Sequence, residues 1–565
     1  MSPKLNWLRL TIYSLSASLI GLSFIGGVIG YSPIPYWDMW GATLQFVQRF
    51  DDDPFRLLFS QHNEHRIVLS RLLFLVDYHV FDGASAFLVV CNYLFALAIW
   101  AVLARCLLAL NAAEKHPDRW ILVALLGAWL FLWAQKVNFT WAFQSQFFLA
   151  QLLPLLAFLS LGQAAVRSGT WNRWFLSAVL LGAMSSLTMA NGVFALPLMA
   201  FGAVLLRMKP GPIIVLALCA AIVISLYFSD YHQPSAHGSV LQTLTSQPLS
   251  ILLYTFTYLG NPGVYIAGSS DLVKGLSALV GLGLAVTASG LTALAVRRCP
   301  AHPVSFGLLL FIIFVGAGAF VTATGRLSFG LDSAFSSRYT TPVLMAWAAL
   351  FCIASPRLMR FHTLGASRPY ITFSAAITAL CLLMVGQVRA LTPMHQINHQ
   401  KHVAALALEI GIGDDTLVSL VHPNTDHSLA IARAASHADL GIFGTLELQS
   451  ARELLGQSAM LSTHRTCAGD LENFEIIDNE PGYVRIYGWQ FASRRERQGP
   501  RFHIVDADSK IVGIAIPGRA SPHLEEAYGQ IAARSGFTGY LQSGAVGKEL
   551  RIISGQCQSI DRLGD

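Results

Sequence analysis

Two short polar segments near the start of the chain hold the side chains best suited to chemistry. In the first, Tyr36-Trp37-Asp38-Met39-Trp40, a carboxylate stands among aromatic rings. The second, His62-Asn63-Glu64-His65-Arg66, places five polar residues in a row between apolar runs. A carboxylate at a membrane surface can take a proton from a hydroxyl group as a general base. Asp38 is our candidate for that role.

Asp38 also has an ordinary structural interpretation. An aspartate at this position suits the first turn of a helix. The tryptophans beside it would then lie in the membrane interface, where such amphipathic rings are enriched. The motif by itself does not decide between a base and a helix cap.

The second segment is compatible with three roles. Its two histidines and Glu64 would, with Asp38, supply nitrogen and oxygen ligands for a divalent metal. In a second role, Arg66 or one of the histidines would lie beside a phosphate. The structural alternative is a helix start with Asn63 as the N-cap. The spacing matches no standard metal pattern, so we favour positioning roles, with Glu64 as the second catalytic candidate and the metal left open.

Polar side chains also interrupt later apolar stretches. Amides and rings between Lys136 and Gln146 suit sugar hydroxyls and sugar faces, and Asn138-Phe139-Thr140 also fits a glycosylation sequon. Arginines after long apolar runs suit a phosphate, although such side chains also reach lipid headgroups. The candidates for substrate binding are Trp37, Trp40, His62, His65, Arg66, Lys136, Asn138, Gln144, Asn191, His232, Arg326, Arg338 and Tyr339.

The composition is that of an integral membrane protein. Of the 565 residues 54% are hydrophobic and only 12% are charged, against about 25% charged in soluble domains. A span needs roughly 20 apolar residues. The candidate spans, several of them short, are 7–30, 85–110, 120–134, 147–166, 174–188, 192–206, 212–228, 275–296, 304–324, 340–355 and 370–388. No small-residue cleavage site follows the first stretch, so we expect a retained helix.

Loop charges predict the orientation. Short loops rich in Lys and Arg alternate with segments that carry Asp, among them Asp38 and Asp230. Because basic loops stay in the cytoplasm, the N-terminus is predicted inside. An odd number of spans then places the C-terminal part outside, which in a bacterium is the periplasm. The net charge of +6 follows this pattern and not a nucleic-acid surface.

The remaining segments divide the chain into three predicted parts. The membrane module covers 1–390 and includes a first outer segment, 31–84. There Trp37, Trp40, Leu44 and Val47 recur at helical spacing, which predicts a helix lying in the interface. Further interfacial helices are expected from 64 to about 81 and over 248–259. Residues 391–465 are predicted to be helices around one strand at 416–421.

The third part, 466–565, is predicted to be a small β-sandwich. Short strands are expected at 483–488, 502–505, 511–516, 537–541 and 550–553, separated by polar turns. Cys467 and Cys557 are the only cysteines in the polar C-terminal region. A pair in an oxidising compartment predicts a disulfide.

Together the motifs resemble the GT-C superfamily of polyprenyl-phosphate-sugar glycosyltransferases. The likeness lies in an acidic residue in the first outer loop, interfacial helices after it, many spans and a soluble C-terminal domain. The motifs are also similar to a bacterial subgroup of arabinofuranosyltransferases, including the pilin arabinosyltransferase type. That similarity rests on Pro35 to Trp40, His62 to Arg66, Asn138 to Gln146, Gly325-Arg326, Ser337-Arg338-Tyr339, Gly488-Trp489, Val512-Gly513 and Ser535 to Tyr540.

The resemblance implies a GT-C fold with about eleven transmembrane helices and an inverting transfer with Asp38 as base. We therefore expect a bacterial inner-membrane enzyme that moves a sugar, a pentofuranose among the candidates, from polyprenyl phosphate to a glycan or pilin-like protein at the periplasmic face. Its expected partners are that donor, that acceptor and membrane lipids, with no nucleic acid. Members of the family differ in metal use, so no cofactor is fixed.

Two other classes stay open at this stage. One is a polymerase or ligase of lipid-linked glycans, which would depend on His232 or Arg338. The other is a transporter or flippase of lipid-linked sugars. Few ionisable residues lie in the predicted spans, which weighs against a transporter.

Overall fold

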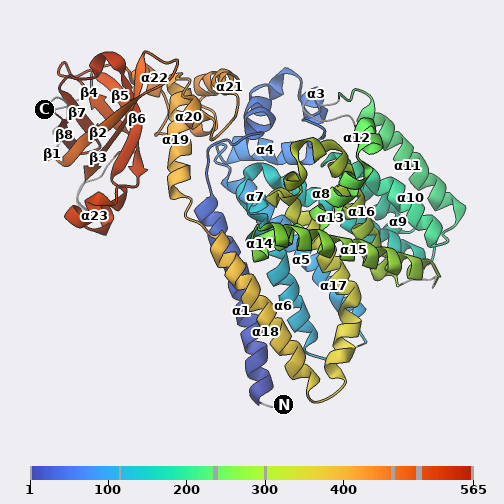
Figure 1. The fold of residues 1–565 in the computed structure, drawn as a ribbon. Helices are drawn as coiled ribbons and strands as arrows, with labels where there is room; N and C mark the ends of the chain where they lie inside the picture. The colour runs from blue at the N-terminus through green and yellow to red at the C-terminus, as the bar shows by residue number, and fades with distance from the viewer. Residues whose placement is uncertain are drawn as a thin grey trace. The chain divides into compact units, whose positions relative to one another are not determined.

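The chain folds into two compact units, each assembled from three stretches of sequence (Figure 1). The structure, a computed structural model, describes residues 3–113, 116–232, 240–297, 302–459, 465–491 and 499–561. Unit 1 comprises Met1–Tyr31, Leu58–Leu72 and Leu88–Thr392, and unit 2 comprises Ser32–Leu57, Leu73–Phe87 and Pro393–Asp565. Most of the segment between the first two long helices therefore belongs with the C-terminal part, whereas the sequence analysis assigned it to the membrane module.

Unit 1 is a bundle of apolar helices, among which α1 and α18 lie side by side (Figure 1). Among the described residues, nine helices are long and apolar enough to cross a membrane. Two further predicted spans are helices of 13 and 11 residues, α9 and α10, shorter than a crossing needs. The helical membrane character is confirmed, and the count of eleven spans stays a prediction.

The helices lying wholly or mainly in unit 1 are α1 (Pro3–Gly30), α5 (Ala86–Leu110), α6 (Arg119–Leu130), α7 (Lys136–Thr140), α8 (Ser145–Val166), α9 (Arg173–Ser185), α10 (Ala195–Leu205), α11 (Pro210–Phe228), α12 (Val240–Ser246), α13 (Pro248–Leu259), α14 (Pro262–Ala267), α15 (Asp271–Arg297), α16 (Pro303–Arg326), α17 (Thr340–Thr363) and α18 (Arg368–Ala390). Two further helices, α3 (Pro54–Phe59) and α4 (Val68–Val80), are divided between the units, and the first two residues of α5 also belong to unit 2.

The backbone between α6 and α8 breaks into short turns inside unit 1. Such irregular backbone needs protein partners when lipid surrounds it. The Trp133 N–H donates to Gln387 Oε1 at 2.8 Å, and Ser337 Oγ donates to the Ala134 carbonyl at 2.7 Å. Most residues from 131 to 146 are buried. The polar stretch between α6 and α8 is therefore buried within protein.

Within unit 2, residues of the C-terminal stretch cover the apolar face of Ser32–Leu57, the segment that follows α1. Trp40, the first residue of the π-helical turn η1 (Trp40–Gln45), is fully buried, and its ring centroid lies 6.3 Å from that of Phe443. Leu44 lies in the same core. The spacing that predicted an interfacial helix therefore reflects burial against protein, and an interfacial position for Trp40 is wrong. Trp37 is 46% exposed.

The part of unit 2 from Pro393 to 459 is helical. Its helices are α19 (His395–Ile410), α20 (Asp415–Val418), α21 (Thr425–His437) and α22 (Ala451–Leu454), and α2 (Phe46–Gln48) and α23 (His523–Tyr528) lie elsewhere in the unit. The strand predicted at 416–421 is wrong, because α20 covers the first half of that stretch and a turn covers the rest. The Asp414 side chain accepts a hydrogen bond from the Leu417 N–H and caps this helix.

The C-terminal strands form one eight-stranded sheet in the order β1-β8-β7-β4-β5-β6-β3-β2. Only β1 and β8 pair in parallel. The strands are β1 (Arg465–Thr466), β2 (Ala468–Ile476), β3 (Tyr483–Phe491), β4 (Phe502–Val505), β5 (Ile511–Arg519), β6 (Gly536–Gln542), β7 (Leu550–Ser554) and β8 (Cys557–Asp561). The predicted β domain and all five expected strands are present.

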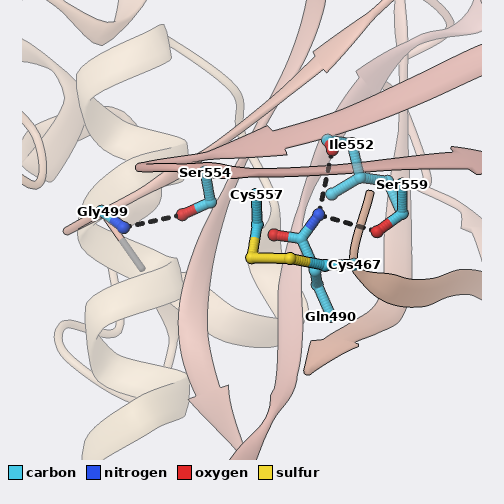
Figure 2. The surroundings of a disulfide bond; sticks show 7 residues. All are labelled: Cys467, Gln490, Gly499, Ile552, Ser554, Cys557 and Ser559. Atoms are coloured by element: carbon cyan, nitrogen blue, oxygen red, sulfur yellow. Dashed lines mark hydrogen bonds between the residues drawn. A yellow bond between two sulfur atoms is a disulfide. The ribbon is translucent and has the colours of Figure 1, made fainter. Parts of the chain in front are cut away.

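The β domain is a single curled sheet and not the expected sandwich of two sheets. β2 and β8 come close to each other although they are not paired. Gln490 on β3 donates to the Ile552 carbonyl at 3.0 Å and to Ser559 Oγ at 2.8 Å, which joins β3 to β7 and β8 across the curl (Figure 2). Phe502 and Phe537 fill the enclosed core.

Asp414 joins the helical part of unit 2 to this sheet. Its fully buried carboxylate accepts hydrogen bonds from Arg485 Nε on β3 at 2.8 Å and from the Tyr540 hydroxyl on β6 at 2.8 Å. Burial opposes the charge of Arg485, but the Asp414 carboxylate outweighs it and raises the pKa of that guanidinium. Losing one member of such a buried pair typically costs about 3–5 kcal/mol.

The predicted disulfide is present. It joins Cys467, between β1 and β2, to Cys557 at the start of β8 (Figure 2). The bond therefore links the two ends of the sequence that forms the sheet.

Replacing both cysteines, Cys467→Ser with Cys557→Ser, should lower the free energy of unfolding of the β domain by about 2–4 kcal/mol, because the bond closes a long loop. Pulse proteolysis of the purified full-length protein measures this change. The exposed Cys381 on α18 supplies the control, since Cys381→Ser should change nothing. Equal protease resistance of the double variant and the wild type would contradict the expectation.

Candidate functional site

The second polar segment forms a tight turn in unit 1. His62 and His65 exchange backbone hydrogen bonds of 2.8 and 2.9 Å. Asn63 at the tip has a φ of 49°, in the left-handed region that asparagine tolerates best among non-glycine residues. Because α4 begins only at Val68, the expected helix start with Asn63 as N-cap is wrong. The side chains of Glu64, His65 and Arg66 instead contact different parts of unit 1.

Glu64 meets two basic side chains within unit 1. Its Oε1 accepts a hydrogen bond from Arg326 Nη2 at 3.1 Å, and His65 Nε2 lies 3.6 Å from the same oxygen. His65 Nδ1 accepts from the Ala190 N–H at 3.1 Å, so a neutral His65 carries its proton on Nε2, facing Glu64. The Glu64 side chain is 20% exposed. It is a sheltered carboxylate, suited to accept hydrogen bonds from hydroxyl groups.

Asn191 follows Ala190 directly in the turn η5 (Ala190–Phe194). Its Oδ1 is buried and makes no hydrogen bond within the described part of the chain. The turn places Asn191 next in sequence to the residue that contacts His65.

Arg66 is buried and its guanidinium is fully engaged. Nε donates to the Tyr227 carbonyl at 3.0 Å, Nη1 donates to the Phe59 carbonyl at 2.6 Å, and Nη2 pairs with Asp230. The hydrogen bond from Arg66 lowers the pKa of Asp230. These contacts attach the turn to the end of α11. We therefore assign Arg66 a positioning role and not direct phosphate binding.

Two neighbours of the turn extend the polar region. Gln61 Oε1 accepts from the His232 N–H at 2.9 Å, which brings His232 to the base of the turn with its side chain exposed. Arg71 on α4 donates to the Leu58 and Ser60 carbonyls at 3.0 and 2.6 Å. Burial and the charge of Arg66 lower the pKa of Arg71 to about 10, so it remains a cation at neutral pH.

A second group of residues contains two cations that have no acidic partner among the described residues. Asn138 on α7 donates to the Arg338 carbonyl at 2.9 Å and to Thr341 Oγ1 at 2.6 Å, which holds α7 against η8 (Ser337–Tyr339). The Arg338 guanidinium lies over the Tyr339 ring, 5.3 Å from its centroid. Across the described residues, neither this guanidinium nor the Lys136 amine makes an ion pair or side-chain hydrogen bond.

Both cations are partly buried. A partly buried charge without a partner is unfavourable, because burial removes water without replacing it. A bound anion would supply the missing charge, and a guanidinium and an ammonium together suit a phosphate. Asn138 itself is fully buried, so its amide is not accessible and the glycosylation sequon is not a modification site.

Tyr254 and Tyr258 on α13 connect the two groups of residues. The Tyr258 ring centroid lies 4.9 Å from that of Tyr339. Tyr254 lies within the electrostatic reach of both Arg326 and Arg338. The sequence analysis anticipated α13 with the same bounds but missed these tyrosines. Their spacing of four residues, which puts both on one helix face, is the signal that would have identified them.

Gln144 contributes an unsatisfied amide. The residue ends the turn η4 (Ala142–Gln144) and is fully buried, yet neither amide atom makes a hydrogen bond within the described part of the chain. The neighbouring Phe143 ring lies 5.5 Å from that of His62, and Ser145 Oγ lies 2.9 Å from Ser70 Oγ. An unpaired buried amide costs roughly 1–3 kcal/mol. A hydroxyl-rich ligand or water beside the turn would remove this cost.

Asp38 belongs to unit 2, in the turn before η1. Trp37 has a φ of 49°, unusual for a bulky residue, and its N–H donates to the Val421 carbonyl at 2.7 Å. The Asp38 carbonyl accepts from the Ala42 N–H at 2.8 Å, and the residue is partly buried. Strained backbone of this kind concentrates at functional sites.

Within unit 1 the structure thus brings Glu64 together with His65 and Arg326. It also brings α7, which carries Lys136 and Asn138, against η8, which carries Arg338 and Tyr339. Three predicted site residues, Trp37, Asp38 and Trp40, lie in unit 2. Neither unit by itself contains all the members of the metal set suggested by the sequence, His62, Glu64, His65 and Asp38.

Comparisons of the chain with protein-family models, curated proteins and solved structures found no match.

Arg338→Ala should weaken binding of a short-chain isoprenyl monophosphate about 10–100-fold, because a hydrogen bond to a charged group contributes about 1.5–3 kcal/mol. Thermophoresis of the detergent-purified protein measures the dissociation constant. Arg173→Ala is the matched control, since Arg173 is an exposed arginine 5.5 Å from the ring centroid of Trp174. Unchanged affinity in Arg338→Ala would exclude Arg338 from an anion site.

Proposed function

We propose that the protein is a membrane glycosyltransferase that moves a sugar from a polyprenyl-phosphate donor to an acceptor hydroxyl, with inversion. The observation that supports this most is the pair of uncompensated cations, Lys136 and Arg338, in a bundle of apolar helices. A ligand with a phosphate head and a hydrocarbon tail fits such a setting. The resemblance to GT-C enzymes points to the same class.

In the proposed reaction the acceptor oxygen attacks the anomeric carbon while Asp38 takes its proton. The bond between that carbon and the phosphate oxygen breaks, and polyprenyl phosphate leaves with its negative charge. Lys136 and Arg338 stabilise this charge as it develops, which is usually the largest contribution to catalysis. Glu64, held by Arg326, orients sugar hydroxyls, and the amide of Gln144 adds hydrogen bonds.

We further propose that the reaction takes place at the periplasmic face of a bacterial inner membrane. The disulfide between Cys467 and Cys557 supports an oxidising compartment for unit 2. The N-terminus would be cytoplasmic, as the loop charges suggest. The donor sugar would be a pentofuranose, and the acceptor a glycan or a pilin-like protein that the C-terminal domain presents.

Asp38→Asn should lower transfer at least about 100-fold, because the amide keeps the shape of the side chain but cannot take a proton. The measurement uses a deletion strain that expresses either the wild-type protein or the variant. Mass spectrometry of its surface polysaccharide and pilin shows whether the sugar is present.

The matched control is Asp51→Asn, which neutralises an exposed aspartate of the same segment. Size-exclusion chromatography of both purified variants checks that they fold. Normal glycan from a folded Asp38→Asn protein would refute the base assignment, and an unchanged surface in the deletion strain would refute the proposed acceptors.

A further inference from the structure

A cluster of two histidines and an aspartate lies near the start of α6 in unit 1. His116 and Asp118 precede the helix, and His362 is the penultimate residue of α17. One potential ligand atom from each residue lies within 4.8 Å of the other two. His362 Nε2 is 2.9 Å from Asp118 Oδ2, and His116 Nδ1 is 3.3 Å from the same oxygen. The Asp118 and His362 side chains are 4% and 6% exposed.

The hydrogen bonds around His362 allow two neutral tautomers. Thr372 Oγ1 lies 2.7 Å from His362 Nδ1 and 3.1 Å from the carbonyls of Arg368 and Pro369, and its single proton goes to only one of the three. When the hydroxyl donates to a carbonyl, Nδ1 carries a proton, and a neutral His362 presents the lone pair of Nε2 to Asp118. A metal bound at Nε2 would select this tautomer.

His116 presents a lone pair as well. Its Nδ1 accepts a long hydrogen bond of 3.3 Å from the Asp118 N–H, so this nitrogen is unprotonated in the neutral ring. A metal would take the single lone pair of Nδ1 in place of this long hydrogen bond. In the tautomer of His362 with its proton on Nδ1, two ring nitrogens and one carboxylate oxygen then face one another, and a cation would stabilise them in addition to Arg9, which donates to Asp118.

We propose that His116, Asp118 and His362 bind a divalent transition metal, with Zn²⁺ the best fit, and that water completes the coordination. Imidazole nitrogen and carboxylate oxygen are ligands of Zn²⁺, and three protein ligands plus water form a common tetrahedral set. None of these three ligands has a role in the proposed sugar transfer, so the metal proposal is independent of that function.

The groups that contact these three side chains suit a metal site. Arg9 on α1 donates from Nε to Asp118 Oδ1 at 2.7 Å and from Nη2 to Oδ2 at 3.0 Å. A carboxylate oxygen has two lone pairs, so Oδ2 retains one for the metal. Metal-bound histidines usually donate their other N–H, and His362 with its proton on Nδ1 would donate to Thr372 Oγ1, 2.7 Å away. The ion would connect α6 and α17 directly, and α1 and α18 through Arg9 and Thr372.

The test uses the purified full-length protein in detergent, treated with a chelator and reloaded with Zn²⁺ or Co²⁺. Mass spectrometry of the metal should give one zinc per chain, and Co²⁺ should produce the visible absorption bands of a tetrahedral complex. Competition with a chromophoric chelator gives the affinity. We expect His116→Ala and His362→Asn to weaken binding at least about tenfold, and Thr372→Val about 10–100-fold through loss of its hydrogen bond.

His302→Ala is the matched control, because His302 is an exposed histidine at the start of α16 and should leave affinity unchanged. His116 is 35% exposed, so its removal leaves the bundle folded even if His362→Asn does not. The proposal is overturned if the wild type binds less than one ion per chain, or if His116→Ala binds as tightly as His302→Ala. Protonated His362 paired with Asp118 would then explain the contact.

Discussion

Hydrocarbon offers no hydrogen bonds, and this constraint determines how the helices of unit 1 are joined. Gln387 illustrates it: its Oε1 accepts from the Trp133 N–H, and its Nε2 donates to the Leu19 carbonyl at 2.9 Å. This one side-chain amide thus accepts a hydrogen bond from the interrupted backbone after α6 and connects α18 to α1. Other buried groups do not follow this pattern. Both amide atoms of Gln144, Nε of Arg338 and Oδ1 of Asn191 make no hydrogen bond within the described residues.

In unit 2 a buried carboxylate has the corresponding role. Asp414 caps α20 and binds Arg485 and Tyr540 from the sheet, so the helices and the strands share one core. The carbonyl of Val421, three residues after α20, receives the N–H of Trp37. The backbone that presents Asp38 is therefore fixed by residues almost 400 positions later in the sequence. The candidate base depends on the C-terminal fold as well as on its own motif.

Much of the fold is predictable because hydropathy and strand patterns are local properties. Most long helices were identified within a few residues, although α17 continues to Thr363, beyond its predicted end at 355. β4 was identified with its observed bounds, and the disulfide followed from compartment and position. Failures came where distant residues decide the outcome. Trp40 is buried because Phe443 covers it, and no periodicity distinguishes a face that meets lipid from one that meets protein. The stretch after Asp414 has strand-like composition, but a single capping carboxylate favours a helix.

The candidate site was likewise predictable where local sequence decides the outcome and not where distant residues do. Arginines near helix ends are visible in the sequence, but only the structure shows that Arg66 is engaged whereas Arg338 is not. The contact between Asp118 and His362 spans 244 residues, so spacing rules for metal ligands do not reveal it. By contrast, Tyr254 and Tyr258 on α13 were within reach of a sequence argument.

The discontinuity of unit 2 has a consequence for biogenesis. Its first two stretches, Ser32–Leu57 and Leu73–Phe87, are synthesised roughly 300 residues before its third, Pro393–Asp565. Phe443, whose ring lies against Trp40, is synthesised roughly 400 residues after it, so at about 5–20 residues per second Trp40 waits on the order of 20–80 s for this partner. The turn that carries Asp38 is thus completed only after the bundle has been translated.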